Sequence, residues 1–150
     1  MKRLSNQKRV LLVLLCLCLV FIWGNSCLSV PQSQGLSNGV LSWLCKLLGL
    51  EAGEEAAPSG SHLIRKLAHF SEFACLGLLF SALCGASWKL DRQCFLALLL
   101  FGLSAALIDE TIQCFTGRGS MVSDVWLDLA GYLVGCLVKI CFFSSKNNKK

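Results

Sequence analysis

Nine polar or ionisable side chains lie in or beside apolar segments of this chain, and together they could do chemistry. Ionisable groups are costly inside membrane-type segments, so they usually mark a site, an ion pair or a proton pathway. The basic members could hold an anion such as phosphate, while the histidine and the carboxylates could orient that ligand or relay protons. The candidates are Arg65, Lys66, His69, Glu72, Asp109, Gln113, Arg118, Asp124 and Asp128.

The first group of candidates opens a long apolar segment. Arg65, His69 and Glu72 are spaced at i, i+4 and i+7, and residues with this spacing share one face of an α-helix. Lys66 stands beside Arg65 at the entrance to the segment. The spacing therefore predicts one polar stripe that starts with basic residues and continues with a histidine and a glutamate.

Two later segments carry carboxylates at helical spacing. Asp109 and Gln113 are four residues apart, as are Asp124 and Asp128, so each pair shares a helix face. We expect Asp109 and Gln113 to face inward, whereas Glu110 should reach water at the end of its helix. Asp124 is expected both to cap the next helix and to pair with a cation. Asp128 lies one helical turn farther into the same segment than Asp124.

Small residues continue these polar stripes. Glycines in such stripes let neighbouring membrane helices approach closely. The sequence thus predicts that a neighbouring helix closely approaches each of two segments, the one that carries His69 and the one that carries Asp128. The small residues are Gly77, Ser81 and Gly85 on the first segment and Gly131 and Gly135 on the second.

The composition indicates a membrane protein. Hydrophobic residues make up 55% of the 150 residues and charged residues only 15%, which is too apolar for an ordinary soluble domain. The net charge of +5 comes mostly from lysines and arginines near the two ends of the chain. Basic ends beside apolar runs favour anionic lipid headgroups as partners. Nucleic acid is not predicted as a partner, because no basic face with interleaved aromatic residues is visible.

The chain contains ten cysteines, most of them inside apolar runs. None forms a CxxC pair, so we interpret them as small apolar packing residues. Cys27, Cys45 and Cys114 lie outside or at the ends of the runs, where a disulfide is possible but cannot be assigned. No zinc-ligand spacing is present, and the sequence predicts no metal and no cofactor.

The apolar runs predict an all-α, polytopic membrane bundle of four transmembrane helices in a single domain. A short amphipathic helix over residues 40–50, lying on the membrane surface or against the bundle, is expected between the first two spans. A turn with a helix cap is expected at 58–61. The predicted spans are 10–30, 67–88, 94–113 and 124–143.

The first span admits a second interpretation. The apolar run at 10–23 is shorter than the about 20 residues that a spanning helix needs. With the basic residues before it, this run resembles the hydrophobic region of a signal peptide. Extension to residue 30 supplies the missing length, and we favour an uncleaved span.

The distribution of basic residues predicts the orientation of the bundle. Lysines and arginines gather near both termini and in the short turn at 89–93, and cytoplasmic loops are enriched in such residues. Four spans with both termini in the cytoplasm fit this distribution. The nine candidates then share the outer face, where Arg65, Lys66 and Arg118 oppose the carboxylates. We interpret Arg118, in a glycine-flanked loop, as a ligand for these carboxylates or for an anion.

Four motifs, in this order, resemble the VanZ-like family, a group of small bacterial membrane proteins named for a teicoplanin-resistance accessory protein. The resemblance covers about residues 26–138. Asp128 departs from the pattern, since the family often has asparagine there. The motifs are RKLAHFSEF at 65–73, DETIQ at 109–113, GR at 117–118 and SDV at 123–125 followed by Gly131.

The resemblance implies a multi-pass protein of the cell envelope with an effect on glycopeptide susceptibility. An outward-facing polar pocket would bind a phosphate-bearing or cell-wall-related ligand, such as a wall precursor or the glycopeptide itself. Two other functions stay open. One is a membrane-embedded acid/base enzyme acting on a lipid-linked precursor, although no nucleophile motif is evident. The other is a small transporter.

Overall fold

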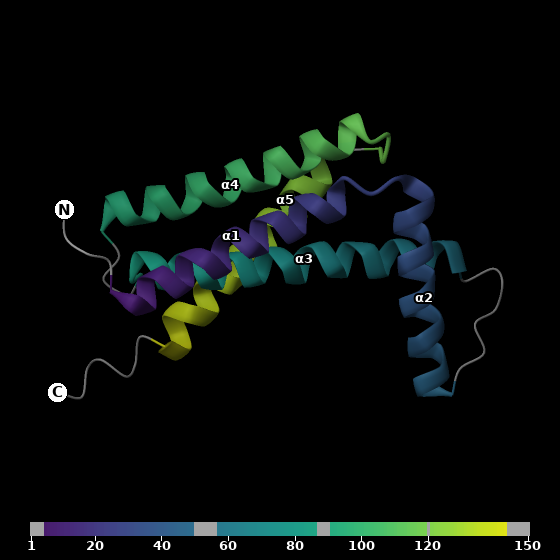
Figure 1. Ribbon diagram of the computed structural model, residues 1–150, viewed down its shortest axis with the longest axis horizontal. Helices are drawn as coiled ribbons and strands as arrows, with labels where there is room; N and C mark the ends of the chain where they lie inside the picture. The colour runs from purple at the N-terminus through teal and green to yellow at the C-terminus, as the bar shows by residue number, and fades with distance from the viewer. Residues whose placement is uncertain (1–4, 50–56, 87–90, 120, 144–150) are drawn as a thin grey trace.

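The computed structural model describes residues 5–49, 57–86, 91–119 and 121–143, and this part of the chain is all-α. Three long helices run side by side, a fourth crosses them obliquely, and one further helix projects from the end of the bundle (Figure 1). The elements are α1 (Asn6–Ser26), α2 (Val30–Leu48), α3 (Ala57–Cys84), α4 (Arg92–Phe115), α5 (Val122–Val138) and the π-helical turn η1 (Lys139–Phe143).

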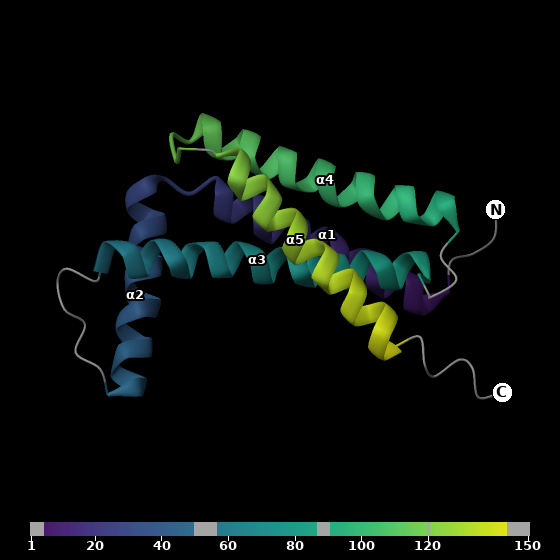
Figure 2. The ribbon, with the colours of Figure 1, turned by 180° about the vertical axis from the view of Figure 1, so that it is seen from behind.

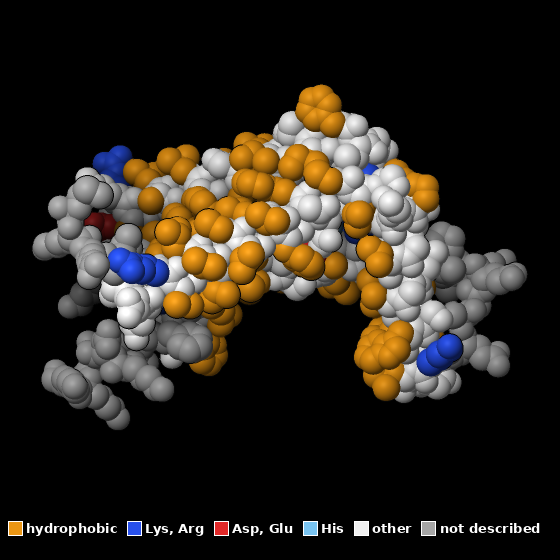
Figure 3. Space-filling model, viewed as in Figure 1, with side chains coloured by type: hydrophobic (Ala, Val, Ile, Leu, Met, Phe, Trp, Pro, Cys, Tyr) orange, Lys and Arg blue, Asp and Glu red, His pale blue; other side chains and the backbone are white. Residues whose placement is uncertain are grey.

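Four of the helices are long and apolar enough to cross a membrane, which confirms the four predicted spans. Hydrophobic side chains cover much of the surface of the bundle (Figure 3), as lipid-facing helices require. The candidate spans are Asn6–Ser26, Gly60–Cys84, Arg92–Phe115 and Val122–Phe142.

The ends of the helices follow from local chemistry. Asp91 caps α4, because its carboxylate accepts a hydrogen bond from the backbone N–H of Cys94 at 2.8 Å. Gly85 ends α3 with a φ of 67°, a backbone conformation that glycine adopts without strain. The predicted continuation of this span to Trp88 lies outside the described residues beyond Ala86.

Two predicted boundaries were wrong. Helix α3 begins at Ala57, well before residue 67, so the turn and cap expected at 58–61 are absent there. Pro58 lies in the first helical turn. Backbone N–H groups have no hydrogen-bond partner within the helix at this position, so proline, which lacks the N–H, is tolerated there. The first span ends at Ser26 rather than at residue 30, because Ser29 begins a new helix.

The helix between the first two spans is longer than predicted. The structure does not confirm a short helix at 40–50, since α2 has 19 residues and starts at Val30. At its start the backbone N–H of Ser29 donates to the Gln32 side chain at 3.1 Å, as in a capping box. Pro31 fits the first turn.

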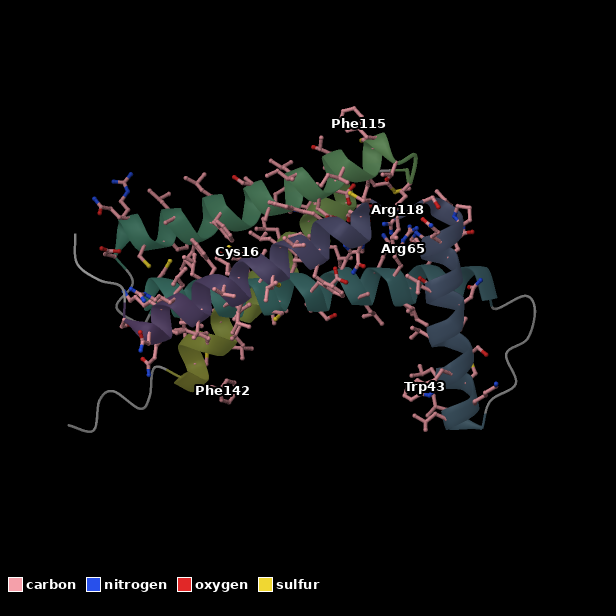
Figure 4. All side chains as sticks on the ribbon, in the orientation of Figure 1. Cys16, Trp43, Arg65, Phe115, Arg118 and Phe142 are labelled. Atoms are coloured by element: carbon pink, nitrogen blue, oxygen red, sulfur yellow. The ribbon has the colours of Figure 1, made fainter. Side chains whose placement is uncertain are left out.

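Helix α2 runs across the direction of the spans (Figures 1 and 2). It contacts the start of α3, where Leu41 lies over Gly60. Figure 4 shows Trp43 on the left side of α2, which is the side on which the spans extend from this end of the bundle. Its exposed apolar residues are Leu36, Val40, Trp43, Leu44, Leu47 and Leu48.

Helices α3 and α5 pack backbone to backbone. The close approach that the small residues predicted is therefore present, and the structure adds that these two helices are the partners. A Cβ atom added at Gly77 would overlap the carbonyl of Tyr132, and one added at Gly135 would overlap the carbonyl of Ala74. A Cβ atom added at Gly131 would likewise overlap the carbonyl of Phe70. Gly85 does not belong to this contact, because nothing lies within 4 Å of its Cβ position and it ends the helix instead.

We predict that Gly135→Ala destabilises the bundle, because the new methyl group forces α3 and α5 apart. The expected loss in the free energy of unfolding is about 2 kcal/mol, typical of overpacking in a core. Unfolding of the detergent-solubilised protein by denaturant measures it. Gly24→Ala in α1 is the matched control, since its Cβ meets nothing within 4 Å. Equal stability of the two variants would contradict the close packing.

Candidate functional site

The candidate residues gather at one end of the bundle, where α1 and α4 end and where α3 and α5 begin. Figure 4 shows Arg65 and Arg118 close together at this end, beside α2. Contacts between the helix ends give the same placement, with Ser26 bound to Asp109 and Lys66 bound to Asp124. The residues thus share one end of the bundle.

Asp109 of α4 is at the centre of this end and is 0% exposed. Its Oδ1 accepts a hydrogen bond from the Ser26 hydroxyl of α1 at 2.7 Å, and its Oδ2 accepts one from Gln113 Nε2 at 2.7 Å. Asp109 and Gln113 therefore both face inward, as expected. The role of Ser26 was missed, because a lone serine at the end of an apolar run carries no periodic signal.

Glu110 does not reach water, contrary to expectation. It is only 4% exposed and lines a small cavity with Arg65 and Lys66. Helix α4 contacts both α1 and α5, so two adjacent positions on it are covered by different neighbours. The assumption that the end of a helix must be solvated was therefore wrong at this position.

His69, Asp109 and Asp128 come from α3, α4 and α5 and meet between these helices. His69 Nδ1 lies 3.6 Å from Asp109 Oδ2. One possible ligand atom from each of the three residues lies within 4.8 Å of the others, so the group could hold a metal ion. Because the residues belong to three helices, no spacing along the sequence could have revealed the group.

Lys66 and Asp124 form an ion pair with 2.9 Å between Nζ and Oδ1, which joins α3 to α5. The expected cation partner of Asp124 is therefore present, but the expected cap is not. Met121 is the N-cap residue of α5, and Asp124 lies in the first helical turn. A carboxylate there still interacts favourably with the helix dipole.

Arg118 ties the loop after α4 to the corner between α1 and α2. Its Nη1 donates to the carbonyl of Asn25 at 2.7 Å and its Nη2 to the Ser33 hydroxyl at 2.9 Å. Gly117 and Gly119, with φ of 72° and 70°, shape the loop around it. Within the described chain no carboxylate lies at ion-pair distance, so the predicted pairing with a carboxylate is not formed.

Arg118 is only 8% exposed, and burial lowers the pKa of its guanidinium from the usual value. The nearby charge of Arg65 acts in the same direction, and Asp109 opposes both effects. An arginine keeps its charge in proteins even when its pKa is lowered. The loop therefore places a permanent, partly desolvated positive charge beside the buried carboxylates.

A cavity of about 140 Å³ lies between α1, α2 and α3. Glu72 is held at its edge, because its Oε1 accepts a hydrogen bond from Asn25 Nδ2 at 2.9 Å. The cavity is lined by the polar residues Asn25, Ser33, Ser37, Arg65, His69, Glu72 and Arg118 and by the apolar residues Leu28, Leu36, Val40, Ile64 and Ala68.

The cysteines do not contribute a disulfide to this site. Cys27, Cys45 and Cys114 are free thiols in the structure. The sequence had left a disulfide among them open, and the structure instead holds this end of the bundle together by hydrogen bonds and one ion pair.

Comparison with known proteins places the chain in a family. The family model described as VanZ/LLP1 matches residues 10–143, which is most of the chain. This match confirms the resemblance inferred from the motifs. Neither a curated protein nor a solved structure matches the chain.

We predict that Ser26→Ala lowers the free energy of unfolding by about 2 kcal/mol, because it removes a hydrogen bond to a fully buried carboxylate. Ser71→Ala is the control. Ser71 is exposed and bonds only to the carbonyl of Ala68 in its own helix, so a change within about 0.5 kcal/mol is expected there. Denaturant titration monitored by circular dichroism compares the two, and equal losses would show that Asp109 does not depend on Ser26.

Proposed function

Because the chain belongs to the VanZ/LLP1 family, we propose that it acts in the bacterial cell envelope by binding a phosphate-bearing or cell-wall-related ligand. The proposed site is the cavity between α1, α2 and α3. The proposed outcome is a lower susceptibility to glycopeptides such as teicoplanin, either by keeping the drug from its target or by altering wall precursors.

The guanidinium of Arg118 is the observation that carries the proposal. Two of its nitrogens are held by Asn25 and Ser33, but its buried Nε has no hydrogen-bond partner among the described residues. A buried donor without a partner is costly, and a charged oxygen in the cavity would satisfy it. Arg65 lines the same cavity and makes no hydrogen bond or ion pair with another described residue. The two guanidinium groups outnumber Glu72, the one carboxylate in the lining of this cavity, and so favour an anion there.

The size and the lining of the cavity favour a lipid-linked phosphate over a whole glycopeptide. A volume of about 140 Å³ is below the roughly 300–1,000 Å³ of pockets that hold drug-sized ligands. It could hold a phosphate headgroup but not a large polycyclic peptide. The apolar residues Leu36, Val40 and Ile64 line the same cavity and could contact the hydrocarbon chain of such a lipid.

The direction of α2 supports a site near a membrane surface. A helix that crosses the spans at one end would lie along the headgroup region, with exposed apolar residues such as Trp43 and Leu47 toward the hydrocarbon. The cavity beneath α2 would then open at the depth where lipid phosphates lie. The distribution of basic residues assigns this end to the outer side.

A second candidate function is acid/base catalysis on the same class of lipid. It is favoured by His69, which lines the cavity and lies 3.6 Å from the buried Asp109. A histidine oriented by a carboxylate is a common general base. Turnover of a lipid-linked precursor by the purified protein would favour this candidate over simple binding.

We predict that Arg65→Gln and Arg118→Gln each weaken binding of a phosphate-bearing lipid by at least about tenfold, the expected loss for one charge-assisted hydrogen bond. Lipids that copurify with the protein are measured by mass spectrometry, and affinities by titration with undecaprenyl phosphate. Arg65→Gln separates binding from folding, because Arg65 makes no hydrogen bond or ion pair within the described part of the chain.

Arg92→Gln is the matched control for this prediction. Arg92 is exposed at the opposite end of the bundle, so its loss should change neither binding nor glycopeptide susceptibility. The proposal fails if Arg65→Gln binds the lipid as tightly as Arg92→Gln, or if cells that express either variant keep the same susceptibility.

We also predict that the end of the bundle with the cavity faces the outside of the cell. In a cysteine-free background, Ser123→Cys should react with a membrane-impermeant maleimide in intact cells, because Ser123 is exposed at this end. Arg92→Cys, at the other end, should react only after the cells are permeabilised. The reverse pattern would contradict the proposed orientation.

A further inference from the structure

We propose that His69, Asp109 and Asp128 bind a divalent transition-metal ion, most simply Zn²⁺, between α3, α4 and α5. The site is distinct from the proposed phosphate contacts of Arg65 and Arg118. Histidine nitrogen and aspartate oxygen are both zinc ligands, and catalytic zinc sites use three protein ligands and keep the fourth position open. The inference does not depend on the proposed ligand, because binding of the ion can be measured without one.

The geometry is close to what an ion requires. In a tetrahedral zinc site, bonds of about 2.1 Å place ligand atoms about 3.4 Å apart. His69 Nδ1 and Asp109 Oδ2 are already 3.6 Å apart. One possible ligand atom from each of the three residues lies within 4.8 Å of the others. Side-chain rotation would bring these atoms to the spacing that an ion requires.

Two atoms of the group are buried without a hydrogen-bond partner among the described residues. They are Asp128 Oδ2 and His69 Nδ1. Asp128 is 1% exposed, and a carboxylate buried this deeply is costly unless a positive charge neutralises it. One cation between these atoms would satisfy both at once.

Asp109 is already held in a ligand-like orientation. Ser26 and Gln113 donate to its two oxygens, each at 2.7 Å. Metal-binding carboxylates are typically fixed by hydrogen bonds of this kind, which set the direction of the free lone pairs. Asp109 Oδ2 therefore stays oriented toward His69 before any ion arrives.

The charges around the group also favour a divalent cation. Five carboxyl groups and three basic side chains line the two cavities or contact His69, so acidic groups outnumber basic groups at this end. The acidic residues are Glu72, Asp109, Glu110, Asp124 and Asp128, and the basic residues are Arg65, Lys66 and Arg118. A bound Zn²⁺ would offset this excess of acidic groups.

A fourth coordination position would have room. His69 and Asp128 line a cavity of about 10 Å³, enough for roughly one water molecule. His69 also lines the larger cavity of about 140 Å³. The ion would thus lie next to both spaces, where water or an anionic oxygen could complete its coordination.

The test measures zinc in the full-length protein, purified in detergent and dialysed against buffered Zn²⁺. We expect about one zinc per chain by elemental analysis, and an increase in the Tm of the wild type with Zn²⁺ compared with chelator. Asp128→Asn should weaken zinc binding at least tenfold and abolish the increase in Tm. His69→Gln is the second ligand variant, in case Asp128→Asn does not fold.

Asp124→Asn is the matched control, because Asp124 lies one turn before Asp128 and pairs with Lys66 instead. This variant should keep its zinc. Co²⁺ substitution distinguishes the site from the ten cysteines, since nitrogen and oxygen ligands give no sulfur charge-transfer band. The proposal is wrong if the wild type takes up no stoichiometric zinc, if both ligand variants bind it as tightly as Asp124→Asn, or if the cobalt spectrum shows thiolate ligands.

Discussion

The buried carboxylate of Asp109 is the interaction on which this end of the bundle depends. A charge with no access to solvent inside an apolar bundle must be compensated by its neighbours, because neither water nor lipid can do so. Ser26 of α1 and Gln113 of α4 supply two hydrogen bonds, and His69 of α3 approaches the same oxygen. One side chain thus fixes the relative positions of three helices.

The glycine contacts bring the fourth helix to the same point. Gly131 lets the backbone of α5 rest against the carbonyl of Phe70, the residue that follows His69. Asp128 lies one helical turn before Gly131, so this contact brings Asp128 toward His69. The small-residue packing and the polar cluster are therefore a single arrangement, because a larger residue at position 131 would separate the aspartate from the histidine.

The sequence predicted those features that periodicity encodes. Four apolar runs gave the spans, and residues four apart gave the inward face of Asp109 and the close contact at Gly135. It missed features that depend on which helices become neighbours. Ser26 is a short polar residue with no pattern around it, and Glu110 is buried because α4 has neighbours on two sides. The membrane orientation and the ligand remain predictions.

Arg118 connects the two halves of the site. Its hydrogen bonds reach the last turn of α1 and the first turns of α2, so this one guanidinium sets the corner from which α2 leaves the bundle. The same group lines the cavity that α2 covers. An anion bound at its Nε would compete with neither existing bond, because each uses a different nitrogen. The corner between α1 and α2 and the proposed anion site therefore depend on the same side chain.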